Sequence, residues 1–292
     1  MQPARHDTQA GFSLLQLSIA LVIMGLLVGG TLTGRDLINN AIIRSQISQI
    51  EKYNTAVGTF QNKYGGLPGD LRVDLAIQFG FNTSGSNGSI GWRDGNGFID
   101  GYCNGCGNWV LQAYGETVLF WQDLSQANMI DGTFPNSGAT SGAVTTAPWS
   151  LAKGTTYIGD YFPTAKIGQG NFMYVYDGQN NYYQIGSTWY LQGGDNWYGL
   201  SAMTSVLGNG GMTSNPAMTV QQAYNIDKKM DDGLPTTGNV QALYLSGWVA
   251  NWANSQATDS TTSCYNTTTN TYSISKNGGN GMNCALSFQF QH

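Results

Sequence analysis

The sequence predicts an α+β protein in which a long N-terminal transmembrane helix packs on a globular head built around an antiparallel β-sheet. An uncharged, largely apolar run extends from Phe12 to Gly34, and a helical pattern continues from it to Tyr64. Alternating aromatic runs between residues 148 and 200 favour antiparallel strands. Forty glycines divide the rest of the chain into short elements.

The composition indicates a folded head of low charge. The chain has 292 residues, enough for one or two domains. Only 10% of them are charged, but 41% are hydrophobic and 12% aromatic, which can fill a core. The net charge is −5, without a cluster of Lys or Arg, and an acidic balance repels phosphate backbones. We therefore expect no nucleic-acid partner.

The N-terminal segment predicts an anchor that stays on the mature chain. Residues 1–11 are mostly polar and carry Arg5 and His6. The uncharged run from Phe12 to Gly34 exceeds the ~20 residues that a membrane-spanning helix needs. A secretory signal has a shorter apolar core with its cleavage site after it. Here the candidate cleavage site, between Gly11 and Phe12, precedes the run, so cleavage there would retain the helix.

The helical pattern continues beyond Arg35. Apolar residues recur at three-to-four spacing between Asn, Gln, Ser and Arg, which predicts an amphipathic continuation. They are Ile38, Ile42, Ile47, Ile50, Val57, Phe60 and Tyr64. We assign residues 12–35 to a transmembrane half and 36–64 to an amphipathic half of one helix. The sequence Gly65-Gly66-Leu67-Pro68 ends it.

The start of this helix resembles a known processing signal. Gly11-Phe12-Ser13-Leu14-Leu15 followed by an apolar run is similar to the class III signal of type IV pilins and pseudopilins. Residues 63–70, 115–124 and 226–235 resemble later segments of such proteins, more weakly. The resemblance implies a pilin-like fold, a leader peptide of residues 1–11, cleavage after Gly11 by a prepilin peptidase, and N-methylation of Phe12.

One position departs from the family pattern. The fifth mature residue in this family is usually Glu, which pairs with the free amine of a neighbouring subunit's first residue, and here it is Gln16. In a low-dielectric helix bundle, Gln offers only a neutral hydrogen bond. Gln16 is therefore either the mark of a minor or tip subunit or an uncharged variant that still assembles.

The resemblance also implies a function and a location. It implies a structural subunit, a minor pilin or pseudopilin, of a type IV pilus or type II secretion filament. The partners would be other pilin or pseudopilin subunits, the prepilin peptidase and, before assembly, inner-membrane lipid. The chain would cross the bacterial inner membrane once with its head extracytoplasmic, and would then enter a pilus or pseudopilus in the periplasm or at the cell surface.

An alternative is a surface adhesin that uses the anchor only for display. Trp189 and Trp197, on either side of Gly193-Gly194, would then contact glycans or another extracellular ligand. Aromatic residues are more often part of a core. We do not expect an enzyme, because the two histidines are His6 in the leader and His292 at the chain end, and no common catalytic motif is present.

The head is expected to cover residues 65–292, with residues 131–215 as an insertion or elaboration. Its predicted elements are a helix from Glu116 to about Ile130, strands at 156–161, 172–176 and 182–185, a helix from Pro216 to Met230, and a last strand at 285–291.

Four cysteines predict disulfide bonds. An even number in an apparently exported chain favours bridges over zinc, since only Cys103 and Cys106 are close enough to form one half of a zinc site. Four cysteines allow three pairings, and spacing alone does not choose between them. A bridge between Cys264 and Cys284 would resemble the C-terminal disulfide loop of many pilins, and Cys103 and Cys106 could form a local bridge.

A glycine-rich loop at residues 92–101 carries a candidate calcium site. It presents Asp94, Asn96 and Asp100 at alternate positions, with a backbone carbonyl near Phe98 between them. Such oxygens suit a hard cation, and Glu116 could complete the set. An EF-hand would need Glu where Gly105 stands, so the pattern is partial. The alternative is a turn whose side chains cap their own backbone.

A second acidic group lies near the end of the 216–230 helix. Asp227, Asp231 and Asp232 gather negative charge at a helix C-terminus, where it is unfavourable unless compensated. Lys228 and Lys229, or a bound cation, could compensate it. The other interpretation is a hydrogen-bonded turn.

Overall fold

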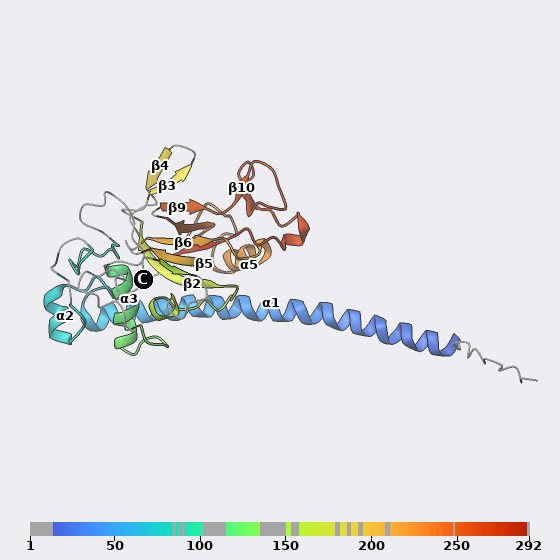
Figure 1. Ribbon diagram of the computed structural model, residues 1–292, viewed down its shortest axis with the longest axis horizontal. Helices are drawn as coiled ribbons and strands as arrows, with labels where there is room; N and C mark the ends of the chain where they lie inside the picture. Colours follow the sequence, from blue (N-terminus) through green and yellow to red (C-terminus); the bar gives the residue numbers. More distant parts are fainter. Residues whose placement is uncertain are drawn as a thin grey trace, which may run out of the picture. The chain divides into compact units, whose positions relative to one another are not determined.

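The protein is described here by a computed structural model (Figure 1). The described residues are 14–83, 86, 88, 91–101, 115–134, 150–152, 158–178, 182–185, 188–191, 195–207, 211–247 and 249–290. The chain divides into two units, Met1–Ile42 and Ile43–His292.

Helix α1, Leu14–Tyr64, is continuous over 51 residues, as the sequence pattern predicts. Its first part is apolar and exposed, with Leu14 87% and Leu26 72% accessible. Ser18 and Thr31 donate their hydroxyls to carbonyl oxygens one turn earlier in the helix. By length and composition, α1 can span a membrane.

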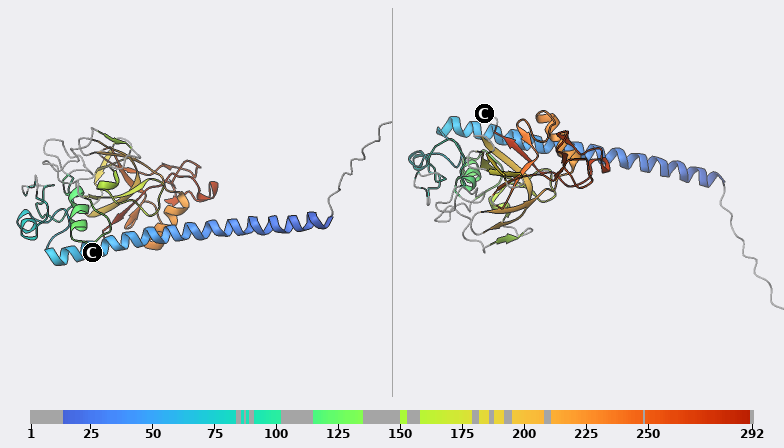
Figure 2. Two further views of the ribbon diagram at one scale, coloured as in Figure 1. Left: turned by 60° about the horizontal axis from the view of Figure 1, so that its bottom comes forward. Right: turned by 90° about the horizontal axis from the view of Figure 1, so that it is seen from above.

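The second half of α1 belongs to the head. Ile43, Ile50, Val57 and Phe60 recur at helical spacing and are buried. Figures 1 and 2 show this half running beside β2, Asn171–Asp177, and α3, Glu116–Gln126. The helix ends at Tyr64 because Gly65 adopts a positive φ of 85°.

The head contains a six-stranded antiparallel sheet. Its long strand β5, Asn196–Leu207, pairs with β1, Ser150–Ala152, with β2, with β6, Met212–Asn215, and with β13, Leu286–Gln289. Strand β7, Val240–Gln241, pairs with the other edge of β13. The long apolar helix followed by this antiparallel sheet domain agrees with the predicted α+β class.

Two smaller sheets complete the strands. One has the order β4-β3-β9-β8, formed by Thr188–Leu191, Tyr182–Ile185, Val249–Trp252 and Leu243–Ser246, with β3 and β9 parallel. The other joins β10, Ser255–Gln256, β11, Tyr265–Asn266, and β12, Thr271–Tyr272. Within the described ranges, the other short helices are α2, Val73–Phe79, α4, Ile158–Tyr161, α5, Val220–Met230, and the 3-10 turn Asn277–Gly279.

Aromatic side chains build the core between α1, α3 and the main sheet. Tyr53 of α1 meets Trp121 of α3 edge-on with ring centroids 5.0 Å apart. Tyr198 of β5 stacks on Phe290 at 4.2 Å. All four side chains are buried, and such aromatic pairs contribute ~0.5–1.5 kcal/mol each beyond the area they bury.

One buried tyrosine connects the main sheet to the second sheet. Tyr174 of β2 lies opposite Gly199 of β5, and its ring covers the space where a side chain at Gly199 would stand. Its hydroxyl oxygen accepts a hydrogen bond from the amide of Leu245 in β8 at 2.9 Å. The glycine is therefore required by packing and not by backbone conformation.

A disulfide joins Cys264 to Cys284. It closes a loop with a sequence separation of 20 residues, which stabilises the fold by ~3 kcal/mol in the chain-entropy model. This settles one bridge, while Cys103 and Cys106 lie outside the described residues.

Several predicted elements are shifted or wrong. Residues 158–161, expected in a strand, form the one-turn helix α4, because Ile158 and Tyr161 bury the same face at a three-residue spacing. Helix α3 ends at Gln126 and not near Ile130. Helix α5 begins only at Val220, after a capping box between Thr219 and Gln222.

Residues 131–215, predicted as an insertion or elaboration, contribute to the main sheet. Strands β1, β2, β5 and β6 all come from this segment, and β5 pairs with the C-terminal strand β13. The segment therefore supplies the centre of the head.

Candidate cation site

Three carboxylates from distant parts of the chain meet beside α3. Asp70 follows the end of α1, Asp94 lies in the 91–101 loop, and Glu116 is the first residue of α3. Each offers a carboxylate oxygen within 4.8 Å of the others. We call these three residues the acidic cluster.

Backbone amides of the 91–101 loop hold the two buried members in place. One oxygen of Asp70 accepts hydrogen bonds from the amides of Gly95 at 2.7 Å and Asn96 at 3.2 Å, and the other accepts from Gly97 at 2.8 Å. Glu116 accepts from the amides of Arg93 at 2.7 Å and Asp100 at 2.9 Å. The carboxylates of Asp70 and Glu116 therefore accept hydrogen bonds from loop amides that do not take part in a β-sheet.

A buried ion pair between Arg93 and Asp123 attaches the same loop to α3. The guanidinium of Arg93 donates two hydrogen bonds to Asp123 of α3, at 2.7 and 2.9 Å, and both side chains are fully buried. Asp123 also accepts from the amide of Gly69 at 2.8 Å, next to Asp70. This fork aligns the Gly69 turn, the loop and α3 around the acidic cluster.

The cluster concentrates negative charge where water is scarce. The pKa of Asp70 is raised to about 8, chiefly by burial; the backbone N–H groups of Gly97 and Gly95 oppose this shift, and Asp94 adds to it. Burial, followed by the charges of Asp70 and Asp100, raises the pKa of Glu116 well above its usual range. The positive charge of Arg93 is bonded to Asp123. A proton or a cation would relieve the remaining repulsion.

The structure unites only part of the predicted calcium ligands. Asp94 and Glu116 meet, whereas Asn96 donates its amide to Asp94 at 3.0 Å and to Asp100 at 2.8 Å. The amide oxygen of Asn96 instead accepts from the amide of Phe98, so Asn96 bridges two acidic residues and presents no oxygen to the cluster. The loop therefore forms the predicted turn, and of the four predicted ligands it brings together only Asp94 and Glu116, without Asn96 or Asp100.

Sequence analysis missed Asp70 as a member of the cluster. Asp70 lies far before Asp94 in the sequence, so no local ligand spacing connects them. The available signal was the turn Pro68-Gly69-Asp70 directly after a long helix. Gly69 adopts a φ of 82° and packs against the backbone of α3, which brings Asp70 to Glu116.

The second acidic group acts as a turn. Asp227 is buried, accepts from the amide of Gly233 at 3.0 Å and from the hydroxyl of Tyr272 at 2.7 Å, and burial raises its pKa to about 7. Asp231 accepts from the amides of Asn239 and Val240. The carboxylate oxygens of Asp227, Asp231 and Asp232 are near enough to one another to hold a cation. The hydrogen bonds nevertheless support the interpretation of this group as a hydrogen-bonded turn between α5 and β7.

Other predicted site residues have separate locations. Trp197 is 3% exposed within β5, so its prediction as a ligand contact is wrong: its ring belongs to the core. Trp189 lies in β4, but the structure does not describe its side chain. Gly11 and Phe12 lie outside the described residues. Gln16 is exposed in the first turn of α1.

Comparison of the chain with family models, with curated proteins and with solved structures finds no match.

Proposed function

We propose that this chain is a structural subunit, a minor pilin or pseudopilin, of a type IV pilus or type II secretion filament. The observation that carries the proposal is helix α1, whose exposed apolar first part follows the sequence Gly11-Phe12 and runs without interruption into the head. Before assembly the helix anchors the subunit in the inner membrane, with the head outside the cytoplasm.

The exposed apolar surface of α1 is stable only when lipid or other protein buries it. Leu21, Val22 and Leu27 are each more than 60% accessible, and burial of apolar surface contributes ~25 cal/mol per Å². A helix of this composition therefore carries a gross driving force of tens of kcal/mol toward lipid or toward equivalent helices of other subunits. Transfer from lipid to a helix bundle keeps that surface covered, which supports a filament subunit.

Gln16 favours a low-copy position in that filament. A subunit repeated throughout a filament makes the same contact many times, so replacing a carboxylate–ammonium pair by a neutral hydrogen bond weakens each contact. A minor or tip subunit makes it few times and tolerates the change.

The test is the covalent state of the N-terminus. Intact-mass analysis of the chain expressed with a prepilin peptidase and extracted from membranes should give a product that begins at methylated Phe12. Gly11→Leu should remain at precursor mass, while Gly29→Ala, within the helix, should be processed normally. A product that begins at Met1, or beyond residue 30, would contradict the proposal.

We also propose that the acidic cluster binds calcium. Three carboxylates meet there, and hard cations prefer such oxygen ligands. The cation would hold the turn at Asp70 and the start of α3 to the 91–101 loop.

The alternative of a displayed adhesin loses support at the loop first assigned to it. That interpretation used the side chains of Trp189 and Trp197 together, and Trp197 is buried. The described side chains of Trp197 and Tyr198, which follow Gly193-Gly194, favour a core role for the start of β5.

A further inference from the structure

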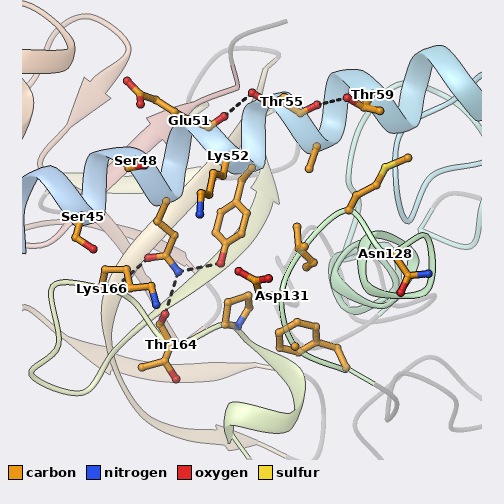
Figure 3. A pocket seen from close by; sticks show the side chains of 18 of the residues that line it. Ser45, Ser48, Glu51, Lys52, Thr55, Thr59, Asn128, Asp131, Thr164 and Lys166 are labelled. Carbon is orange, nitrogen blue, oxygen red and sulfur yellow. Dashed lines mark hydrogen bonds between the residues drawn. The ribbon is translucent and has the colours of Figure 1, made fainter.

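A groove of about 1000 Å³ lies in the head beside the second half of α1 (Figure 3). Its first wall is the face of α1 between Ser45 and Thr59, its second is formed by residues 128–134, and its third by residues 159–166. This volume is in the range of sites that hold small ligands. The groove is separate from the acidic cluster, with which it shares no residue.

The walls of the groove are rich in hydrogen-bonding side chains. Hydroxyl and amide groups line it, together with the aromatic residues Tyr53 and Phe134. The hydroxyl and amide residues are Ser45, Ser48, Gln49, Thr55, Thr59, Asn128 and Thr164. Hydroxyl-rich walls over aromatic rings suit a polyhydroxylated ligand better than an aliphatic one.

Two lysines from different elements extend into this groove. Lys52 comes from α1 and Lys166 from the third wall, and Figure 3 shows both side chains in the groove. Among the described residues, neither lysine forms a salt bridge. Glu51 and Asp131 are the acidic residues of the lining, and Asp131 stands on the second wall. The lining thus holds two ammonium groups and two carboxylates, and because neither lysine is paired with a described carboxylate, both ammonium groups are available to an anionic ligand.

The backbone of the Lys166 segment is held to α1 by buried glutamines. The side chain of Gln49 donates to the carbonyl of Thr164 at 3.0 Å and accepts from the amide of Lys166 at 2.9 Å. Gln46 accepts from the amide of Ile167 at 2.9 Å. These bonds attach the Lys166 segment to α1, so the groove is formed before any ligand arrives and binding costs less ordering.

We propose that this groove binds an acidic saccharide, with its carboxylate between Lys52 and Lys166 and its hydroxyls on the polar wall of α1. The two ammonium groups select the negative charge, and the hydroxyl-rich walls select a sugar over an acidic peptide. The inference concerns the head alone and holds whether or not the chain enters a filament.

The test compares two sugars that differ in charge. The full-length protein in detergent micelles is titrated calorimetrically with a galacturonate oligomer and with the neutral galactose oligomer of equal length. The acidic oligomer should bind more tightly, and its affinity should fall as salt is raised from low to physiological concentration. Lys52→Gln and Lys166→Gln should each weaken it about two- to fivefold, as expected for exposed ion pairs, and the double variant about tenfold.

Lys229→Gln is the matched control, because Lys229 is exposed on α5 outside the groove. It should bind like the unaltered protein. Equal affinity for the two sugars, an unchanged affinity in the double variant, or an equal loss in Lys229→Gln would each overturn the proposal. Binding of a glutamate oligomer as tight as that of the galacturonate oligomer would overturn the assignment to a saccharide.

Discussion

At the scale of single residues, Arg93 and the carboxylates around it show how the loop before α3 is held. Arg93 has a positive φ of 62° and is completely buried, which would be costly for a residue without partners. Its guanidinium donates hydrogen bonds to Asp123 and to the carbonyl of Asn82. Its backbone amide donates to the carboxylate of Glu116. Hydrogen bonds to charged groups therefore hold this part of the loop in place.

We predict that Asp123→Ala is strongly destabilising. It would leave a buried guanidinium without its carboxylate, and breaking a buried pair from one side costs ~3–5 kcal/mol. Thermal unfolding of the full-length protein in detergent measures the change. The control is Asp74→Ala, which breaks the exposed pair with Arg72 and should cost below ~1 kcal/mol. Similar melting temperatures for both variants would show that the buried pair is not needed.

The raised pKa values of the acidic cluster predict a pH dependence. The pKa of Asp70 is about 8 in the folded protein against 3.8 as the reference value, so between these values the folded state binds more protons than the unfolded chain. Stability from this group is therefore present at low pH and lost as pH rises through about 8. Glu116 acts in the same direction. In chelator, the melting temperature should fall between pH 5 and pH 9.

Calcium should reduce that fall, because the cation favours the charged carboxylates that protonation otherwise neutralises. At pH 8, added calcium should raise the melting temperature of the unaltered protein and of Asp36→Asn, an exposed control on α1. Asp94→Asn should lose the response. A calcium effect that persists in Asp94→Asn would place the cation elsewhere.

At the scale of elements, the sequence predicts best where a pattern is local. The apolar and amphipathic periods of α1 specify the whole helix, and alternating aromatics specify β2 and β3. Helix α4 was not predicted, because residues 156–161 alternate like a strand. Its helical form goes with the burial of Ile158 and Tyr161, which the local pattern does not reveal. The acidic cluster was predicted only in part. Asp70 was missed because it joins Asp94 and Glu116 through the turn at Gly69, which local spacing does not reveal.

Packing between β2 and β5 gives a prediction at this scale. Gly199→Ala places a methyl group within the ring of Tyr174, so the ring must move, and this disturbs the hydrogen bond that the amide of Leu245 donates to the Tyr174 hydroxyl. Overpacking of this kind costs ~1–3 kcal/mol. Gly159→Ala, in α4 with no neighbour within 4 Å, is the control and should be nearly neutral. Equal unfolding midpoints in denaturant would refute the packing argument.

At the scale of the whole molecule, α1 combines two environments in one helix. Its first part is apolar and exposed, and from Ile43 onward the same helix contributes to the core of the head. The composition of α1 makes this visible in the sequence, since uncharged residues give way at Arg35 to a mixed pattern. The order of strands in the sheet is not visible, because β5 pairs with strands that lie both before and after it in the chain.

Membrane association should depend on the first part of α1. Replacing both Val22 and Leu26 by Arg adds ~5–7 kcal/mol to the apparent cost of insertion, at ~2.5–3.5 kcal/mol for each charge near the helix centre. The double variant should leave the carbonate-resistant membrane fraction. Asn40→Arg, at an exposed position beyond the apolar run, should remain in that fraction. Retention of the double variant would exclude this segment as the anchor.

The bridge between Cys264 and Cys284 has a consequence for resistance to proteolysis. The enclosed stretch is rich in exposed Thr and Asn, a composition that proteases cut readily, and β13 begins two residues after Cys284. A single cut within the enclosed stretch would leave β13 covalently tethered to the rest of the head and seated between β5 and β7. The sheet could thus outlast a nicked backbone until a reductant releases its final strand.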